Sequence, residues 1–207
     1  MTSGADHALE PVPRELLASR AEDVAPRLLG AIIRRELDGE VVLARITEVE
    51  AYGPDDPASH SVRGRTARCA SMFAAPGTAY VYRSYGVHWC LNISVDEPGV
   101  GAALLLRAAV VLGDERVIRR RRPGVAARSH LLRGPGCLTA GLGITAEHDG
   151  TDLCGGGALL VCTDGWRPEA VRSGPRVGVA RAADVPWRFW LADCASVSRY
   201  RRSPSAG

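Results

Sequence analysis

Residues 31–52, AIIRRELDGEVVLARITEVEAY, carry the clearest structural signal in this chain. Two β-rich runs flank Asp38-Gly39, a dipeptide that strongly favours a tight turn between antiparallel strands. We therefore expect a hairpin with strands at about residues 31–37 and 40–51. Because side chains alternate along a strand, three residues of the second strand share one face: Glu48, Glu50 and Tyr52. An acid and an aromatic ring would then look into one space, unless this is an ordinary solvated sheet face.

The segments on either side of this hairpin differ in character. Before it, apolar residues recur at helical spacing, which predicts one or two amphipathic helices that end at Gly30. After it, residues 53–75 are rich in turn-forming residues and contain Arg63, Arg65 and Arg68. We expect a long surface loop there, and long ordered loops in compact domains are usually functional.

A second hairpin is predicted around Gly86, between β-rich segments at residues 78–85 and 87–95. Four of the 11 aromatic residues of the chain lie in this hairpin: Tyr80, Tyr82, Tyr85 and Trp89. Tyr85 would lie at or near the tip, where the adjacent glycine lets the turn approach a partner closely. Tyr80 and Trp89 fit an apolar core patch equally well, whereas a residue at a tip is a poor core candidate.

The rest of the chain supplies further strands and two helices. Residues 101–112 form a near-continuous apolar run interrupted by Arg107, which predicts a central buried strand that carries one charge. An unpaired charge in a core is costly, so a buried arginine rarely lacks a role. Residues 114–122 are typical of a helix and end in four consecutive arginines. A short helix and three strands complete the prediction, at about residues 137–142, 159–162, 176–179 and 186–190.

The composition is that of a soluble globular protein with one domain. The chain has 207 residues, of which 46% are hydrophobic and 24% charged, and this excludes the disordered and collagen-like classes. No apolar run approaches the ~20 residues that span a bilayer. The first residues also lack the uninterrupted apolar stretch of a signal peptide. We therefore expect a cytoplasmic protein with no membrane partner.

Charge and cysteine usage exclude some kinds of chemistry. All 26 basic residues are arginine, so a lysine Schiff base and a P-loop lysine are excluded. The net charge of +3 permits a polyanionic partner without requiring one. The six cysteines include no C-x-x-C pair, which predicts reduced, mostly buried thiols and no metal. A zinc site built from distant residues is the alternative.

Arginines beside an aromatic tip suggest a nucleic-acid partner. The three arginines of residues 53–75 precede the aromatic hairpin in sequence. This pattern is typical of proteins that grip phosphates and push a side chain between bases. The arginine run at residues 119–122 is weaker evidence, since cations at a helix end are usually solvated.

Several motifs, in this order, resemble one known family. They are Arg45-Ile-Thr-Glu-Val-Glu-Ala-Tyr52, Ala58-Ser-His60, Met72-Phe73, Pro76-Gly-Thr-Ala-Tyr-Val-Tyr82, Tyr85-Gly-Val-His-Trp-Cys-Leu-Asn92, Leu105-Leu-Arg107-Ala, Gly134-Pro-Gly136 and Arg176-Val-Gly-Val179. Together they closely resemble the alkyladenine (3-methyladenine) DNA glycosylase family, of the methylpurine-DNA glycosylase type. The resemblance covers about residues 13–198, and several motifs in the same order are far more specific than any one of them.

The resemblance implies a fold and an activity. The fold would be α/β (α+β), a single domain over residues 1–207 with a curved, mostly antiparallel sheet, peripheral helices and a protruding β-hairpin. The ends, about residues 1–12 and 200–207, would be flexible. The activity would be base excision repair: release of alkylated purines such as 3-methyladenine and 7-methylguanine from double-stranded DNA. Deaminated purines such as hypoxanthine are neutral and would react more slowly. No cofactor is expected, and the protein would act as a monomer associated with the nucleoid.

The resemblance also implies which residues form the catalytic group. Glu50 would be the general base that activates water, with Arg107 and the backbone carbonyl of Val177 helping to hold that water. Because the chain has no lysine, water is the expected nucleophile and the product an intact abasic site. The enzyme would therefore be monofunctional.

The resemblance also implies a pocket for an extruded base. Tyr52 would stack on one face of the base, and His60 and Tyr82 on the other. Asn92 would line the floor as a steric gate against the amino group of guanine. Electron-rich rings suit an alkylated purine, because alkylation at a ring nitrogen leaves it cationic.

The contacts to DNA follow from the same resemblance. Tyr85 would enter the minor groove and fill the gap left by the extruded nucleotide, with Met72 as a second intercalating residue. Arg63, Arg65 and Arg68 would bind the DNA backbone.

Two departures and two alternatives qualify this interpretation. Family members commonly carry asparagine at the position of Cys69, and often lysine where this chain has Cys137. A catalytically silent damaged-DNA-binding protein would keep the pocket and the wedge but lose the acid, whereas Glu50 is present. An RNA-binding module would bind single-stranded RNA through exposed aromatics and would tolerate loss of Glu50.

Overall fold

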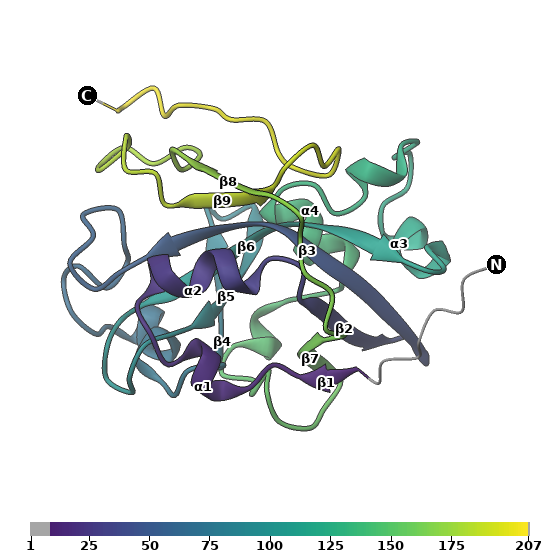
Figure 1. Cartoon of the computed structure of the whole chain (residues 1–207), viewed down its shortest axis with the longest axis horizontal. Helices are drawn as coiled ribbons and strands as arrows, with labels where there is room; N and C mark the ends of the chain where they lie inside the picture. The colour runs from purple at the N-terminus through teal and green to yellow at the C-terminus, as the bar shows by residue number, and fades with distance from the viewer. Residues whose placement is uncertain (1–8, 207) are drawn as a thin grey trace.

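The computed structural model describes residues 9–206, and within them nine strands form one antiparallel sheet (Figure 1). Their order is β1-β7-β2-β3-β6-β5-β4, with β9 beside β3 and β8 beside β9. The bounds are β1 Glu10–Pro11, β2 Ile32–Leu37, β3 Glu40–Tyr52, β4 Ala79–Ser84, β5 His88–Ser94, β6 Ala103–Leu112, β7 Leu159–Thr163, β8 Val171–Gly174 and β9 Arg188–Leu191. The predicted mixed fold with a curved antiparallel sheet is confirmed.

Short helices surround the sheet. They are α1 Arg14–Leu17, α2 Ala21–Leu28, α3 Arg116–Arg121 and α4 Pro135–Gly141, with 3₁₀ helices η1 Ala67–Phe73, η2 Arg128–His130 and η3 Ala146–His148. One or two helices were expected before the first hairpin; two form, and the second ends at Leu28, shortly before the predicted end at Gly30. The predicted helices that correspond to α3 and α4 are confirmed. The helix η1 lies in the segment predicted as a loop. The prediction missed it because the many turn-forming residues of that segment obscure any helical pattern.

Strand β3 changes its neighbour along one edge. Residues 40–45 pair with β2, whereas residues 48–50 pair with β9, and β6 lies along the opposite edge. The pairing with β6 shifts register on both sides of Glu48, which marks a bulge. The bulge lies where β2 gives way to β9, and here Glu48 and Glu50 contact the C-terminal part of the chain.

Both predicted hairpins form. At their tips, Asp38 and Gly39 have φ values of 54° and 76°, and Tyr85 and Gly86 have 49° and 68°. Positive φ at both central residues is typical of the primed turns that join antiparallel strands. An Asp-Gly pair adopts this geometry readily, whereas for tyrosine it is uncommon and costs backbone strain.

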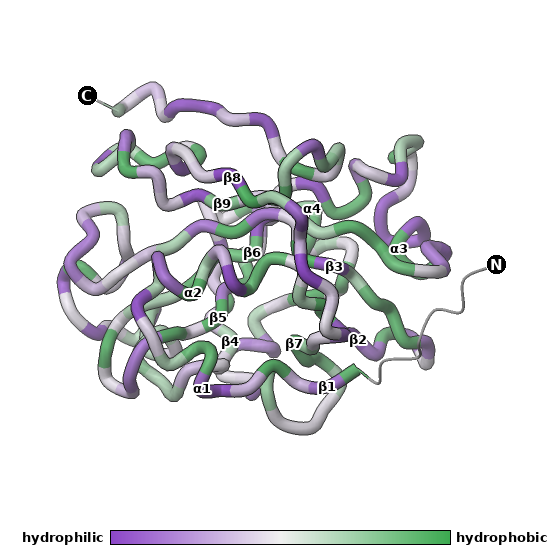
Figure 2. Tube along the Cα trace, viewed as in Figure 1, coloured by the Kyte–Doolittle hydropathy of each residue, from purple (hydrophilic) through white to green (hydrophobic). Residues whose placement is uncertain are grey.

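The main core lies between the sheet and the helices. It includes Leu17, Val24 and Leu28 from the helices, packed with Ile46 and Leu104 from the sheet. A second, smaller cluster of buried residues consists of Cys69, Met72, Tyr80 and Ala103. Figure 2 shows hydrophobic stretches along the central strands and hydrophilic ones along the C-terminal tail.

The strand predicted at residues 176–179 is wrong. Its backbone has no strand partner, because the N–H of Val177 binds a carboxylate and Gly178 has a φ of 72°. The following strand begins at Arg188, two residues later than predicted.

The chain ends differ in part from the expectation. Residues 1–8 and 207 lie outside the described residues. Glu10–Pro11 pairs with β7, and Val12 is buried, so part of the start expected to be flexible is held in the sheet. Near the other end, the carbonyl of Arg201 accepts a hydrogen bond from the N–H of Gly178 at 2.9 Å.

Candidate active site

A cavity of about 760 Å³ opens where strands β3 to β6 meet the loops at residues 57–60 and 177–181. Ten of the predicted site residues line it: Glu50, Tyr52, His60, Arg68, Met72, Tyr82, Tyr85, Asn92, Arg107 and Val177. They come from five separate segments of the chain. The fold therefore gathers most of the predicted site around one space.

Glu50 lines this cavity and is fully buried. Its Oε2 accepts a hydrogen bond from the Tyr52 hydroxyl at 2.9 Å and one from Nη1 of Arg107 at 3.3 Å. Its Oε1 accepts from the backbone N–H of Val177 at 2.7 Å. Three donors therefore fix the orientation of the carboxylate. The sequence prediction gave Val177 a role through its carbonyl and missed this contact of its N–H.

Glu48 lies two residues before Glu50 and is also fully buried. Its Oε1 accepts hydrogen bonds from Nε of Arg107, Nε of Arg188 and the hydroxyl of Ser198, at 2.9, 2.7 and 2.7 Å. Its Oε2 accepts from the N–H of Ser198 at 2.7 Å. Burial by itself raises the pKa of Glu48, but the two guanidinium groups and the Ser198 bonds outweigh it, so the pKa is lowered.

Arg107 connects the two glutamates. It is 6% exposed, which confirms the predicted buried charge on a central strand. Burial lowers the pKa of Arg107, but the charges of Glu50 and Glu48 dominate and raise it above its ordinary value. The guanidinium therefore stays positive beside the Glu50 carboxylate.

A histidine and two tyrosines from the segments after β3 also line the cavity. Nδ1 of His60 lies 2.8 Å from the hydroxyl of Tyr80, and its ring meets Tyr82 edge-on at 4.6 Å. Tyr80 and Tyr82 stack at 5.3 Å between ring centres. Burial raises the pKa of Tyr82, so its phenol is neutral. Burial and the nearby charge of Arg68 lower the pKa of His60, which favours its neutral form.

Asn92 also lines the cavity, and a backbone contact holds its side chain. Asn92 is 4% exposed and lies opposite Tyr80 in the β4–β5 pair. Its Nδ2 donates to the carbonyl of Tyr80 at 2.9 Å, so the side-chain amide is held in one orientation. Leu105, its partner on β6, also lines the cavity.

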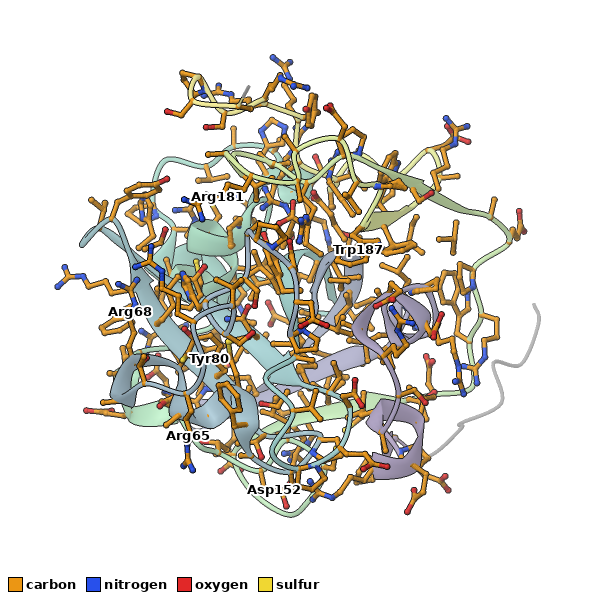
Figure 3. All side chains as sticks on the ribbon, turned by 90° about the vertical axis from the view of Figure 1, so that its left-hand side faces the viewer. Arg65, Arg68, Tyr80, Asp152, Arg181 and Trp187 are labelled. Atoms are coloured by element: carbon orange, nitrogen blue, oxygen red, sulfur yellow. The ribbon has the colours of Figure 1, made fainter. Side chains whose placement is uncertain are left out.

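The predicted DNA-contacting residues are divided between the cavity wall and the surface beyond it. Tyr85 is 94% exposed at the hairpin tip, while Met72 is 2% exposed and packs with Tyr80. Met72 therefore belongs to the buried cluster beneath the cavity rather than to a protruding wedge. Figure 3 shows Arg65, Arg68 and Arg181 on the same side of the molecule as Tyr80. Arg68 and Arg181 line the cavity, whereas Arg63 and Arg65 are exposed beyond its lining.

A buried ion pair behind Tyr52 was not predicted. Arg176 pairs with Asp56, and its Nη1 also donates to the carbonyl of Ala51 at 2.9 Å. The guanidinium lies 4.7 Å from the ring centre of Tyr52 and 5.4 Å from that of Trp187. No local pattern predicts this pair, because Asp56 lies in a turn-rich loop and Arg176 lies in a segment whose pattern predicts a strand.

The arginine run at residues 119–122 is engaged elsewhere. Arg119 pairs with Glu115 at 2.6 Å, and Arg122 donates to the carbonyl of Leu131 at 3.3 Å. Two further pairs reach the tip of the first hairpin: Arg120 with Glu40 and Arg121 with Asp38. These contacts tie α3 to the β2–β3 hairpin and account for the run within the protein.

The two cysteines that depart from the family pattern have local partners. Sγ of Cys69 lies 3.1 Å from the hydroxyl of Thr66 at the start of η1, and the thiol is buried. Sγ of Cys137 accepts a hydrogen bond from Nη2 of Arg122 at 2.9 Å. The part of the chain that the structure describes contains no disulfide and no group of three or more metal-binding side chains, and none of its helices is long and apolar enough to span a membrane.

Comparison with known proteins agrees with the motifs. A sequence model of the methylpurine-DNA glycosylase family matches residues 15–195. A protein of Nocardia farcinica is 47% identical over 190 residues, which cover 88% of each chain. A protein of Mycolicibacterium fortuitum is 49% identical over 188 residues, covering 88% of this chain and 94% of the relative. Both relatives are provisionally named 3-methyladenine DNA glycosylase. The resemblance is thereby confirmed, and the chain belongs to the methylpurine-DNA glycosylase family.

Proposed function

We propose that this protein is a monofunctional DNA glycosylase that extrudes alkylated purines from duplex DNA and hydrolyses their N-glycosidic bond with water activated by Glu50. Membership of the family supports the glycosylase role. The observation that carries the mechanism is the buried Glu50 carboxylate, held by three donors in the wall of a cavity lined with aromatic rings.

Extrusion of the base comes first. A base inside a duplex is out of reach of an active-site carboxylate, so the nucleotide must leave the stack. Tyr85, exposed at the hairpin tip, would enter the duplex and compensate for the lost stacking. Arg63, Arg65 and Arg68 would bind the flanking phosphates.

The base would then be held by its faces. Tyr52 would stack on one face, and His60 and Tyr82 on the other. A cationic alkylated purine gains ~1–2 kcal/mol from desolvated aromatic faces. The fixed amide of Asn92 at the floor would exclude the amino group of unmodified guanine.

In the chemical step, Glu50 takes a proton from water as the oxygen forms a bond to C1′ of the sugar. The glycosidic C1′–N bond breaks, and its electron pair leaves with the base, which neutralises a cationic purine. Arg107 and the carbonyl of Val177 would hold the water. A neutral base such as hypoxanthine must gain a proton as it leaves, so we expect slower release. With no lysine to form an imine, the sugar remains an intact abasic site.

The partner is double-stranded DNA that contains alkylated or deaminated purines, and the protein would act as a monomer in the cytoplasm, at the nucleoid. No cofactor takes part in the proposed steps.

The test uses purified protein with two substrates, a duplex that holds one hypoxanthine and, separately, methylated DNA. Released base is measured first, and strand breaks are then scored with and without hot alkali. We expect base release with breaks after alkali only. Breaks without alkali would contradict the monofunctional mechanism. Tight binding to the lesion without any release would instead favour a silent damaged-DNA-binding protein.

A further inference from the structure

The Arg176–Asp56 pair is the strongest feature that the proposed mechanism does not use. Both side chains are fully buried, and two nitrogens of the guanidinium contact the two carboxylate oxygens. Buried pairs of this kind seldom add net stability over apolar side chains of similar size. Stability alone is therefore a weak explanation for a charged pair at this position.

The pair lies directly behind the cavity. Tyr52 lines the cavity, and the buried guanidinium of Arg176 covers one face of its ring at 4.7 Å, so a base in the cavity would stack on the other face. Two nitrogens of the guanidinium bind Asp56, and Trp187 flanks the guanidinium at 5.4 Å. The guanidinium is the member of the pair that contacts the ring of Tyr52.

We propose that Arg176 is a specificity-determining residue that acts through Tyr52. Its positive charge weakens the attraction of the Tyr52 ring for a cationic base, which lowers the ratio of the affinities for cationic and neutral purines. This inference rests on the proposed function, since it requires a base stacked on the front of Tyr52.

The physical reason is that one ring would serve two cations. A base stacked on the front face would lie about 8 Å from the guanidinium, given ordinary van der Waals separation. Asp56 offsets part of the arginine charge, and the remainder repels a cationic base at that distance. The guanidinium also polarises the π electrons of the ring toward its own face, which weakens the attraction of the other face for a second cation. A neutral base experiences neither penalty.

Arg176 also has a positioning effect, which the test must separate from the effect of its charge. The adjacent Val177 donates its N–H to Glu50, so a displaced Arg176 would disturb the catalytic carboxylate. A displaced Glu50 carboxylate would itself change the attraction for a cationic base. Arg176→Lys, which keeps the positive charge, therefore separates the positioning effect from the charge effect on the affinity ratio.

The experiment measures equilibrium binding to duplexes that contain 7-methylguanine or hypoxanthine, each on a 2′-fluoro sugar that resists cleavage. For Arg176→Met, we expect the affinity ratio of 7-methylguanine to hypoxanthine to rise by about threefold to fivefold. For Asp56→Asn, which leaves the arginine charge unopposed, we expect the same ratio to fall. Arg176→Lys keeps the charge but loses the planar fork, so its ratio should remain near that of the wild type.

A matched control lies away from the cavity. Arg45 pairs with Asp164 at 2.6 Å and lies 4.6 Å from the ring centre of Trp166. Arg45→Met and Asp164→Asn remove the same groups there and should leave the ratio unchanged. Folded fractions of all variants are measured alongside.

Ratios that are unchanged, or that move in the same direction for Arg176→Met and Asp56→Asn, would overturn the proposal and leave Arg176 a structural residue. Failure of the proposed function would differ: the wild type itself would not prefer either lesion duplex to undamaged DNA.

Discussion

Near the end of strand β3, two glutamates lie two residues apart in different environments. Glu48 and Glu50 are both fully buried and both bind Arg107. Glu48 receives further donors from Arg188 and Ser198 and does not line the cavity among the residues described. Glu50 has Tyr52, Arg107 and Val177 as donors and faces the cavity.

The difference shows that the neighbours, rather than the residue type, assign the role. Glu48 compensates two buried arginines and joins β3 to β9 and to the C-terminal segment. Glu50 is held by the same arginine but lies in the wall of the cavity. We therefore assign Glu48 to stability and the placement of Arg107, and Glu50 to the reaction.

The largest expected effect is on the rate at Glu50. For Glu50→Gln we expect base release to slow by about 10²- to 10⁴-fold, because the amide cannot accept a proton from water. Binding to a lesion duplex should survive, since the pocket walls are intact. Single-turnover release and binding titrations measure both, and a rate near that of the wild type would refute the assignment of the base.

Glu48→Gln should instead act on stability. We expect the free energy of unfolding to fall by about 3–5 kcal/mol, because Arg107 and Arg188 lose their shared buried counter-charge. The rate of base release by the folded fraction should fall far less than for Glu50→Gln. Chemical denaturation monitored by tryptophan fluorescence gives the stability, and an unchanged midpoint would contradict the role given to Glu48.

The pH dependence of stability sharpens the same comparison. The folded state lowers the pKa of Glu48, so its stabilising contribution is complete above the ordinary pKa of 4.5 and is lost as the pH falls through the folded value. We expect the free energy of unfolding of the wild type to decrease with acid in that window. Denaturation curves at several pH values should show a flatter profile for Glu48→Gln.

Asp114→Asn is the control for this profile. Asp114 pairs with Arg116 at 2.7 Å, but both side chains are exposed and solvent screens their interaction. Its removal should change the profile far less than Glu48→Gln. Equal changes for the two variants would show that burial of the Glu48 network does not determine its contribution to the free energy of unfolding.

The smallest expected effect on stability is at the hairpin tip. Tyr85→Ala removes a side chain that is 94% exposed, so the free energy of unfolding should stay within ~0.5 kcal/mol of the wild type. Base extrusion should weaken, because the aromatic wedge that replaces the lost stacking is absent. Fluorescence of 2-aminopurine next to a lesion measures extrusion, and an undiminished signal would argue against the wedge.

Local signals account for what the sequence predicted well. The Asp38-Gly39 turn and the alternation after it were sufficient to place Glu48, Glu50 and Tyr52 on one face, and the contacts to Arg107 and Tyr52 agree with that. The apolar run around Arg107 likewise predicted a buried strand. The family motifs then indicated which residues would meet in one pocket.

Long-range contacts account for what the sequence did not predict. Arg188 and Ser198 lie 140 and 150 residues from Glu48 in the sequence. No spacing pattern therefore distinguishes Glu48 from Glu50, which lines the cavity. The pattern around Arg176 predicts a strand, but Arg176 pairs with Asp56 and the N–H of Val177 binds the Glu50 carboxylate instead of a neighbouring strand. Met72 lies in a turn-rich segment, and its burial depends on the packing of η1 against Tyr80, which no local pattern predicts.

The most direct test of the account compares the two glutamates in one assay. Single-turnover release of 3-methyladenine is measured for Glu50→Gln and Glu48→Gln at saturating protein, with each rate corrected for the folded fraction. We predict that the Glu50 variant is slower than the Glu48 variant by at least about 10²-fold. Equal rates for the two variants, or a slower Glu48 variant, would contradict the claim that Glu50 is the base.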